Sequence, residues 1–169
     1  DNDGLPDLYV SNFGQENRLY RNLGDGTFRD LAREAGVVQP VSSFACCFFD
    51  QDNDGNLDLF VAQYSNFTDA RRVAQTAAHY LGLSVLEDPM RLYRGDGKGG
   101  FRDVSVAAGV AFSPQPMALN FGDLDNDGYP DLYLATGYPG FDGLVPNVML
   151  HNVRGERFEK KLADQTIEI

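Results

Sequence analysis

The stretch Asp50-Gln51-Asp52-Asn53-Asp54-Gly55-Asn56-Leu57-Asp58 carries an acidic motif that recurs in two other places in this chain, and the surrounding sequence repeats with it. A second copy covers residues 123–131, and another, which begins inside the motif, covers residues 1–7. With the positions numbered 1 to 9, complete copies carry aspartate at 1, 3, 5 and 9 and glycine at 6. In chain order the copies are named loop 1 (1–7), loop 2 (50–58) and loop 3 (123–131).

The same order of short apolar runs and turns follows each loop. After loop 2 come the runs 59–62 and 91–94 and a glycine turn that ends at Phe101. Spacing is constant, since nine residues separate Leu19 from Phe28 as well as Leu92 from Phe101. Short runs joined by Gly/Asp turns predict four antiparallel strands per unit, which is the architecture of a β-propeller blade.

The fold class predicted is therefore all-β, with residues 1–169 forming part of one β-propeller domain. The units cover about 1–42, 43–115 and 116–169. A closed ring takes about 4 to 8 blades, so these units predict a fragment of a larger propeller.

An insertion lengthens the second unit. Asp3 and Asp54 are 51 residues apart, whereas Asp54 and Asp127 are 73 apart, and the excess covers about residues 66–88. Helical spacing of apolar residues predicts one helix there, with Thr68 as N-cap and Gly82 as its stop. This helical insertion is interpreted as a lid on the propeller rim or, alternatively, as a partner-binding element.

The acidic loops are typical of Ca²⁺ sites, because Ca²⁺ takes about six to eight oxygen ligands that a tight turn can bring together. Position 12 is Val61 or Leu134 rather than glutamate, which excludes an EF-hand. The alternative is that the loops are ordinary Asp/Gly turns without an ion. About one Ca²⁺ per loop is expected, held by carboxylates of Asp1, Asp3, Asp7, Asp50, Asp52, Asp54, Asp58, Asp123, Asp125, Asp127 and Asp131 and by carbonyls of Leu5, Asn56 and Tyr129.

Net charge supports a cation in the loops. The chain has 25 acidic and 14 basic residues, for a net charge of −11, and 11 of the aspartates lie in the three loops. The other 14 acidic residues balance the basic ones, so the net charge is that of the loops. Without a basic patch, nucleic acid is not expected as a partner, and without a run of about 18 apolar residues no membrane span is expected.

Catalytic residues are not predicted. His79 and His151 have no second histidine at metal-ligand spacing and no Ser or Cys partner in a recognisable motif. His151 is aligned with Tyr20 and Tyr93 and is expected to be a packed strand residue.

The pattern Asp50-x-Asp52-x-Asp54-Gly55-x-x-Asp58 resembles the FG-GAP/VCBS repeats of integrin-alpha-type β-propellers. Residues 19–30 and 146–152 are similar to the cartilage acidic protein and ASPIC/UnbV group. The resemblance implies calcium-binding loops, a seven-bladed propeller and an extracellular, cell-surface or periplasmic location. It also implies adhesion or binding of a protein or carbohydrate ligand, with the calcium structural. The alternatives are a carbohydrate-active lyase or hydrolase on the same fold, and a scaffold domain beside a catalytic one.

Overall fold

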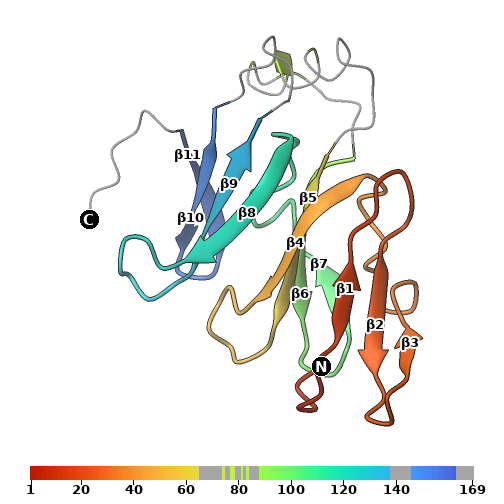
Figure 1. Ribbon diagram of the computed structural model, residues 1–169. Helices are drawn as coiled ribbons and strands as arrows, with labels where there is room; N and C mark the ends of the chain where they lie inside the picture. Colours follow the sequence, from red (N-terminus) through yellow and green to blue (C-terminus); the bar gives the residue numbers. More distant parts are fainter. Residues whose placement is uncertain are drawn as a thin grey trace.

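Three antiparallel sheets stand side by side in the computed structural model (Figure 1). It describes residues 1–64, 88–137 and 146–162, together with positions 74, 77, 78, 81 and 83. The first sheet contains β1 (Leu8–Val10), β2 (Arg18–Asn22) and β3 (Phe28–Asp30). The second contains β4 (Ser43–Phe49), β5 (Asp58–Gln63), β6 (Arg91–Gly95) and β7 (Phe101–Asp103). The third contains β8 (Pro116–Gly122), β9 (Asp131–Thr136), β10 (Val148–Val153) and β11 (Arg157–Leu162).

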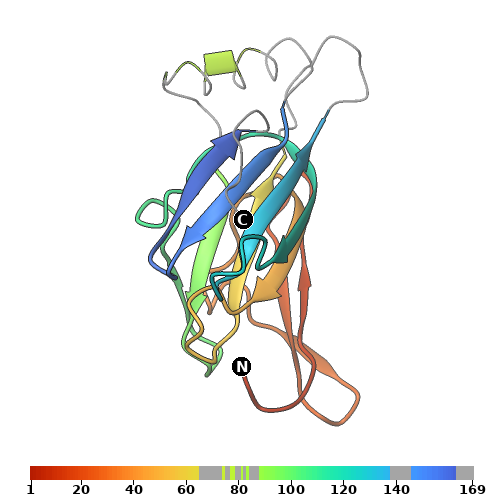
Figure 2. The same cartoon turned by 90° about the vertical axis from the view of Figure 1, so that its left-hand side faces the viewer.

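Strands that follow one another in sequence are hydrogen-bonded neighbours in every sheet. Each acidic loop precedes a strand whose sheet continues in this meander, as expected for a propeller blade. The prediction of an all-β chain built from antiparallel blades is therefore confirmed. Both views place the three acidic loops at the same end of the sheets (Figures 1 and 2).

Strand register corrects the alignment of His151. Leu8 pairs with Tyr20, Leu59 with Tyr93, and Leu132 with Leu150. Leu150, and not His151, is thus the counterpart of the two tyrosines, so the predicted alignment is wrong by one residue. Neighbouring strand residues point to opposite faces, and this shift moves the histidine from the expected packing face to the other one.

Apolar cores lie between neighbouring sheets, and β5 contributes to both of them. All six of its residues are buried, in contrast to the alternation of a strand with one wet face. Leu59 and Val61 pack in a cluster with Leu19 of the first sheet, whereas Phe60 packs in a cluster with Leu132 of the third. This double burial explains why the run after loop 2 is apolar throughout.

The helix predicted between Thr68 and Gly82 lies largely outside the described residues. Within it, Ala74, Ala77 and Ala78 are helical, and the N–H of Leu81 donates to the Ala77 carbonyl at 3.0 Å. Across the described part of the chain, no helix has the length and apolar character needed to cross a membrane.

Candidate metal sites in the acidic loops

Position 9 anchors each loop to a neighbouring strand of its own sheet. Asp58 is fully buried, and its Oδ2 accepts the N–H of Gln51 at 3.1 Å while its Oδ1 accepts the N–H of Gly95 at 2.9 Å. One carboxylate therefore holds the loop before β5 and the end of β6 together. The matching contacts are Asp131 with the N–H groups of Leu124 (3.1 Å) and Asn152 (2.7 Å), and Asp7 with that of Asn22 (2.9 Å).

Positions 1 and 5 curl the loop inward. The two oxygens of Asp50 accept the N–H groups of Asp54 at 3.1 Å and Gly55 at 2.9 Å. Gly55 has φ of 84°, a left-handed conformation that glycine adopts without steric cost. The N–H of Asn56 in turn donates to Oδ1 of Asp54 at 2.8 Å. Loop 3 repeats these bonds through Asp123, which accepts from Asp127 (3.0 Å) and Gly128 (2.9 Å), and through Asp127, which accepts from Tyr129 (2.9 Å).

Carboxylates converge most closely in loop 2. Ligand atoms of Asp50, Asp52 and Asp58 all lie within 4.8 Å of one another. The side chain of Asp52 is only 8% exposed, and its Oδ2 forms an ion pair with the guanidinium of Arg94. Three carboxylates this close repel one another, and a cation between them would offset that cost.

The other loops gather their predicted ligands differently. In loop 3 the converging group is Asp125, Asp127 and His151, again within 4.8 Å. In loop 1 the N–H of Asp3 donates to Oδ1 of Asp1 at 3.3 Å. The converging groups of loops 2 and 3 contain side-chain atoms alone, so the carbonyls of Leu5, Asn56 and Tyr129 stay predicted ligands.

Charge crowding shifts the acidity of loop 2. Burial raises the pKa of Asp58 to about 6, with its two backbone hydrogen bonds opposing the shift and the nearby charges of Asp52 and Asp54 adding to it. Burial also raises the pKa of Asp52, with Arg94 opposing the shift. The pKa of Asp54 is lowered instead, chiefly by the N–H of Asn56. Burial thus disfavours the charged forms of Asp52 and Asp58, whereas the charged form of Asp54 is favoured by its hydrogen bond.

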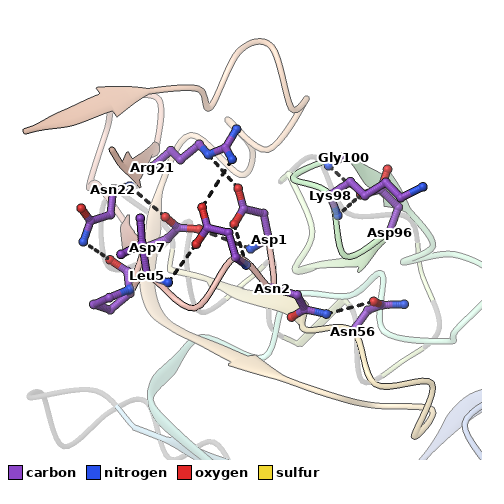
Figure 3. Close-up of polar contacts among 12 residues, drawn as sticks. Asp1, Asn2, Leu5, Asp7, Arg21, Asn22, Asn56, Asp96, Lys98 and Gly100 are labelled. Carbon is purple, nitrogen blue, oxygen red and sulfur yellow. Dashed lines mark hydrogen bonds and ion pairs between the residues drawn. The ribbon is translucent and has the colours of Figure 1, made fainter. Parts of the chain in front are cut away.

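A cationic or basic side chain faces each loop from the neighbouring strand, which the sequence reasoning missed. Nη2 of Arg94, on β6, contacts Asp52 and lies 3.4 Å from Oδ2 of Asp54. The sequence could have indicated this role of Arg94 through its position in the repeat, because it directly precedes Gly95, whose N–H donates to the position 9 aspartate. The counterparts are Arg21, with Nε 2.7 Å from Asp1 and Nη2 3.4 Å from Asp3 (Figure 3), and His151, with Nδ1 3.1 Å from Asp125 and 3.3 Å from Asp131.

Position 4 links loop 1 to loop 2 and loop 2 to loop 3. Nδ2 of Asn53 donates to the carbonyl of Gly128 at 2.9 Å, and Nδ2 of Asn2 donates to the carbonyl of Gly55 at 3.1 Å. Both asparagines have φ near 60°, a conformation that asparagine tolerates better than most residues. The candidate metal sites are therefore connected between blades as well as within them.

Two substitutions of Asn53 separate the contribution of its hydrogen bond to Gly128 from the effect of backbone strain at this residue. We expect Asn53→Gly, which tolerates positive φ, to cost about 1 kcal/mol of unfolding free energy for the lost bond. Asn53→Ala should cost about 2 kcal/mol, because alanine adds strain at φ of 58°. Urea denaturation measures both. Asn126→Gly, at the same position in loop 3, is the control, and equal stability of Asn53→Gly and this control would contradict a contribution from the link.

Comparison with known proteins places these features in a repeat family. A family model described as FG-GAP-like repeat matches residues 1–61 and 82–134. Cartilage acidic protein 1 from Homo sapiens is 30% identical over 122 residues, which are 72% of this chain. The aligned region is 15% of the length of that relative.

Proposed function

The chain belongs to the FG-GAP-like repeat family, and on this premise we propose that it is a calcium-binding β-propeller segment whose acidic loops hold Ca²⁺. The observation that carries the proposal is the convergence of Asp50, Asp52 and Asp58, whose ligand atoms all lie within 4.8 Å of one another. Carboxylate oxygens are ligands that Ca²⁺ prefers, and these residues fit it. When bound, the ion would supply the positive charge that the converging carboxylates need.

The proposed role of the metal is structural. Asp58 already ties its loop to β6, and Asn53 ties the same loop to the next sheet. An ion held by loop 2 would therefore stabilise both the second sheet and its contact with the third. We place the protein in an extracellular, cell-surface or periplasmic setting, where calcium is abundant enough to fill such sites.

Calcium dependence of stability tests this proposal. At about 100 times the Kd of one site, Ca²⁺ should add ~2.7 kcal/mol, which raises Tm by about 5–10 °C for a domain of this size. Melts in EGTA and across a calcium titration measure the rise. Asp54→Ala and Asp127→Ala should each remove part of it.

Asp25→Ala is the matched control, because Asp25 lies in the β2–β3 turn and bonds Thr27 rather than an acidic loop. Its calcium-dependent rise in Tm should equal that of the unmodified chain. If the chain is folded and its Tm does not change with calcium concentration, the proposal is wrong and the loops are ordinary turns without an ion.

We further propose that the segment takes part in adhesion through a protein or carbohydrate ligand. An aromatic cluster supports this role. The ring of Phe44 lies 5.5 Å from that of Tyr64, and Phe13 lies 6.3 Å from the same tyrosine, while both phenylalanines are more than half exposed. Exposed aromatic rings suit both protein contacts and the flat faces of sugars.

Binding of the chain to immobilised glycans and matrix proteins tests the ligand proposal. Phe13→Ser with Phe44→Ser should reduce any binding at least tenfold without lowering Tm much, because both rings are exposed. Phe28→Ser, another exposed phenylalanine in β3, is the control. Equal binding by the two variants would contradict a role for the cluster.

A further inference from the structure

Arg94 faces loop 2 from a neighbouring strand and brings a positive charge to its carboxylates. It lies on β6, one residue before Gly95, whose N–H binds Asp58. Its guanidinium contacts Asp52 at position 3 and lies 3.4 Å from Asp54 at position 5. Both aspartates are proposed calcium ligands.

The same arrangement recurs in loop 1. Arg21 contacts Asp1 and Asp3, which are positions 3 and 5 of that loop (Figure 3). Two independent copies of the repeat thus place a guanidinium on the same two carboxylates. Loop 3 has an imidazole there instead, which contacts Asp125 and Asp131. A shared position and shared partners make a chance surface ion pair a poor explanation.

A guanidinium in this position competes with a metal ion. It only donates hydrogen bonds and cannot act as a ligand, so it engages carboxylate lone pairs that the ion would otherwise take. Its charge also repels a divalent ion at short range. The Arg94 side chain is 39% exposed and emerges toward solvent, so it can withdraw without unpacking the core.

We propose that Arg94 is the resident cation of loop 2. It neutralises Asp52 and Asp54 while the loop lacks a metal, and it is displaced when Ca²⁺ binds. Arg94 therefore stabilises the metal-free loop and weakens its calcium affinity, and Arg21 does the same in loop 1. This inference rests on the proposed calcium-binding function and names the residue that regulates it.

A calcium titration followed by amide NMR resolves the loops without altering their ligands. The N–H of Gly55 reports on loop 2 and that of Gly128 on loop 3, since each donates to the position 1 aspartate at 2.9 Å. Arg94→Met should lower the Kd seen at Gly55 about tenfold by removing the competing charge, with the Kd at Gly128 unchanged. It should also lower Tm in calcium-free buffer.

Two further variants separate charge from packing. Arg94→Lys keeps the charge and should give a Kd within about threefold of the unmodified chain. Arg91→Met removes a guanidinium from the same strand, but Arg91 pairs with Asp88 and Asp103 outside the loops, so its Kd should not change. A tighter site in Arg94→Met alone supports the inference.

If the Kd measured at Gly55 is unchanged or higher in Arg94→Met, the proposed role of Arg94 is wrong, although the protein still binds calcium. If neither glycine responds to Ca²⁺ in any variant, the proposed function itself is wrong. The two failures are therefore distinguishable in one set of titrations.

Discussion

Asp58→Ala is expected to lower the free energy of unfolding by about 2–5 kcal/mol, even in calcium-free buffer. The substitution removes the acceptor of two backbone N–H groups, those of Gln51 and Gly95, at a fully buried site. Each buried donor left without a partner costs ~1–3 kcal/mol. The loss disconnects the loop and the start of β5 from the end of β6, so we also expect it to weaken the second sheet.

Urea denaturation in calcium-free buffer measures this effect without a contribution from bound metal. Asp54→Ala is the matched control, because Asp54 is an aspartate of the same loop with a more exposed side chain. It should cost about 1 kcal/mol, mainly through the hydrogen bond from Asn56. Asp58→Asn retains one acceptor and should be intermediate. A loss for Asp58→Ala no greater than that for Asp54→Ala would contradict the anchoring role.

Phe60→Ala is expected to cost about 3–5 kcal/mol, because a fully buried phenylalanine is replaced by a cavity. Phe60 packs in the cluster between the second and third sheets with Leu132 and Leu134. Its loss should therefore loosen the contact between two blades. At ~2–4 °C per kcal/mol for a chain of this size, the fall in Tm is about 6–20 °C.

Tyr133→Ala supplies a control at the same position of the repeat. Phe60 pairs with Leu92 in the second sheet as Tyr133 pairs with Met149 in the third, but Tyr133 is 41% exposed. We expect a loss of no more than about 1–2 kcal/mol for this variant by calorimetry or urea denaturation. Similar losses for both variants would show that the cluster between the sheets does not depend on Phe60.

Local spacing was enough to predict the strands and the acidic loops. The motif runs directly into β5, whose first residue is Asp58, and the equal spacing of Leu92 and Phe101 predicts the positions of β6 and β7. These features depend on residues close together in the chain, where turn chemistry and apolar runs are read directly. The position 6 glycine likewise adopts the left-handed φ that its tight turn requires.

Contacts between strands and between blades could not be predicted from local spacing. The alignment of His151 was wrong by one residue, and in a strand one residue decides which face a side chain occupies. The approach of Arg94 to Asp52 depends on that same register, over 42 positions of chain. The hydrogen bond from Gly95 to Asp58 and the link from Asn53 to Gly128 also join segments that are distant in sequence.

Repetition in the amino-acid sequence therefore determines the blades, their order of strands and the positions of the candidate ligands. Tertiary packing alone decides which aspartates are buried, which cation faces them and how one loop contacts the next. The physical reason is that backbone turns respond to neighbouring residues, whereas burial and charge pairing depend on the register and stacking of whole sheets.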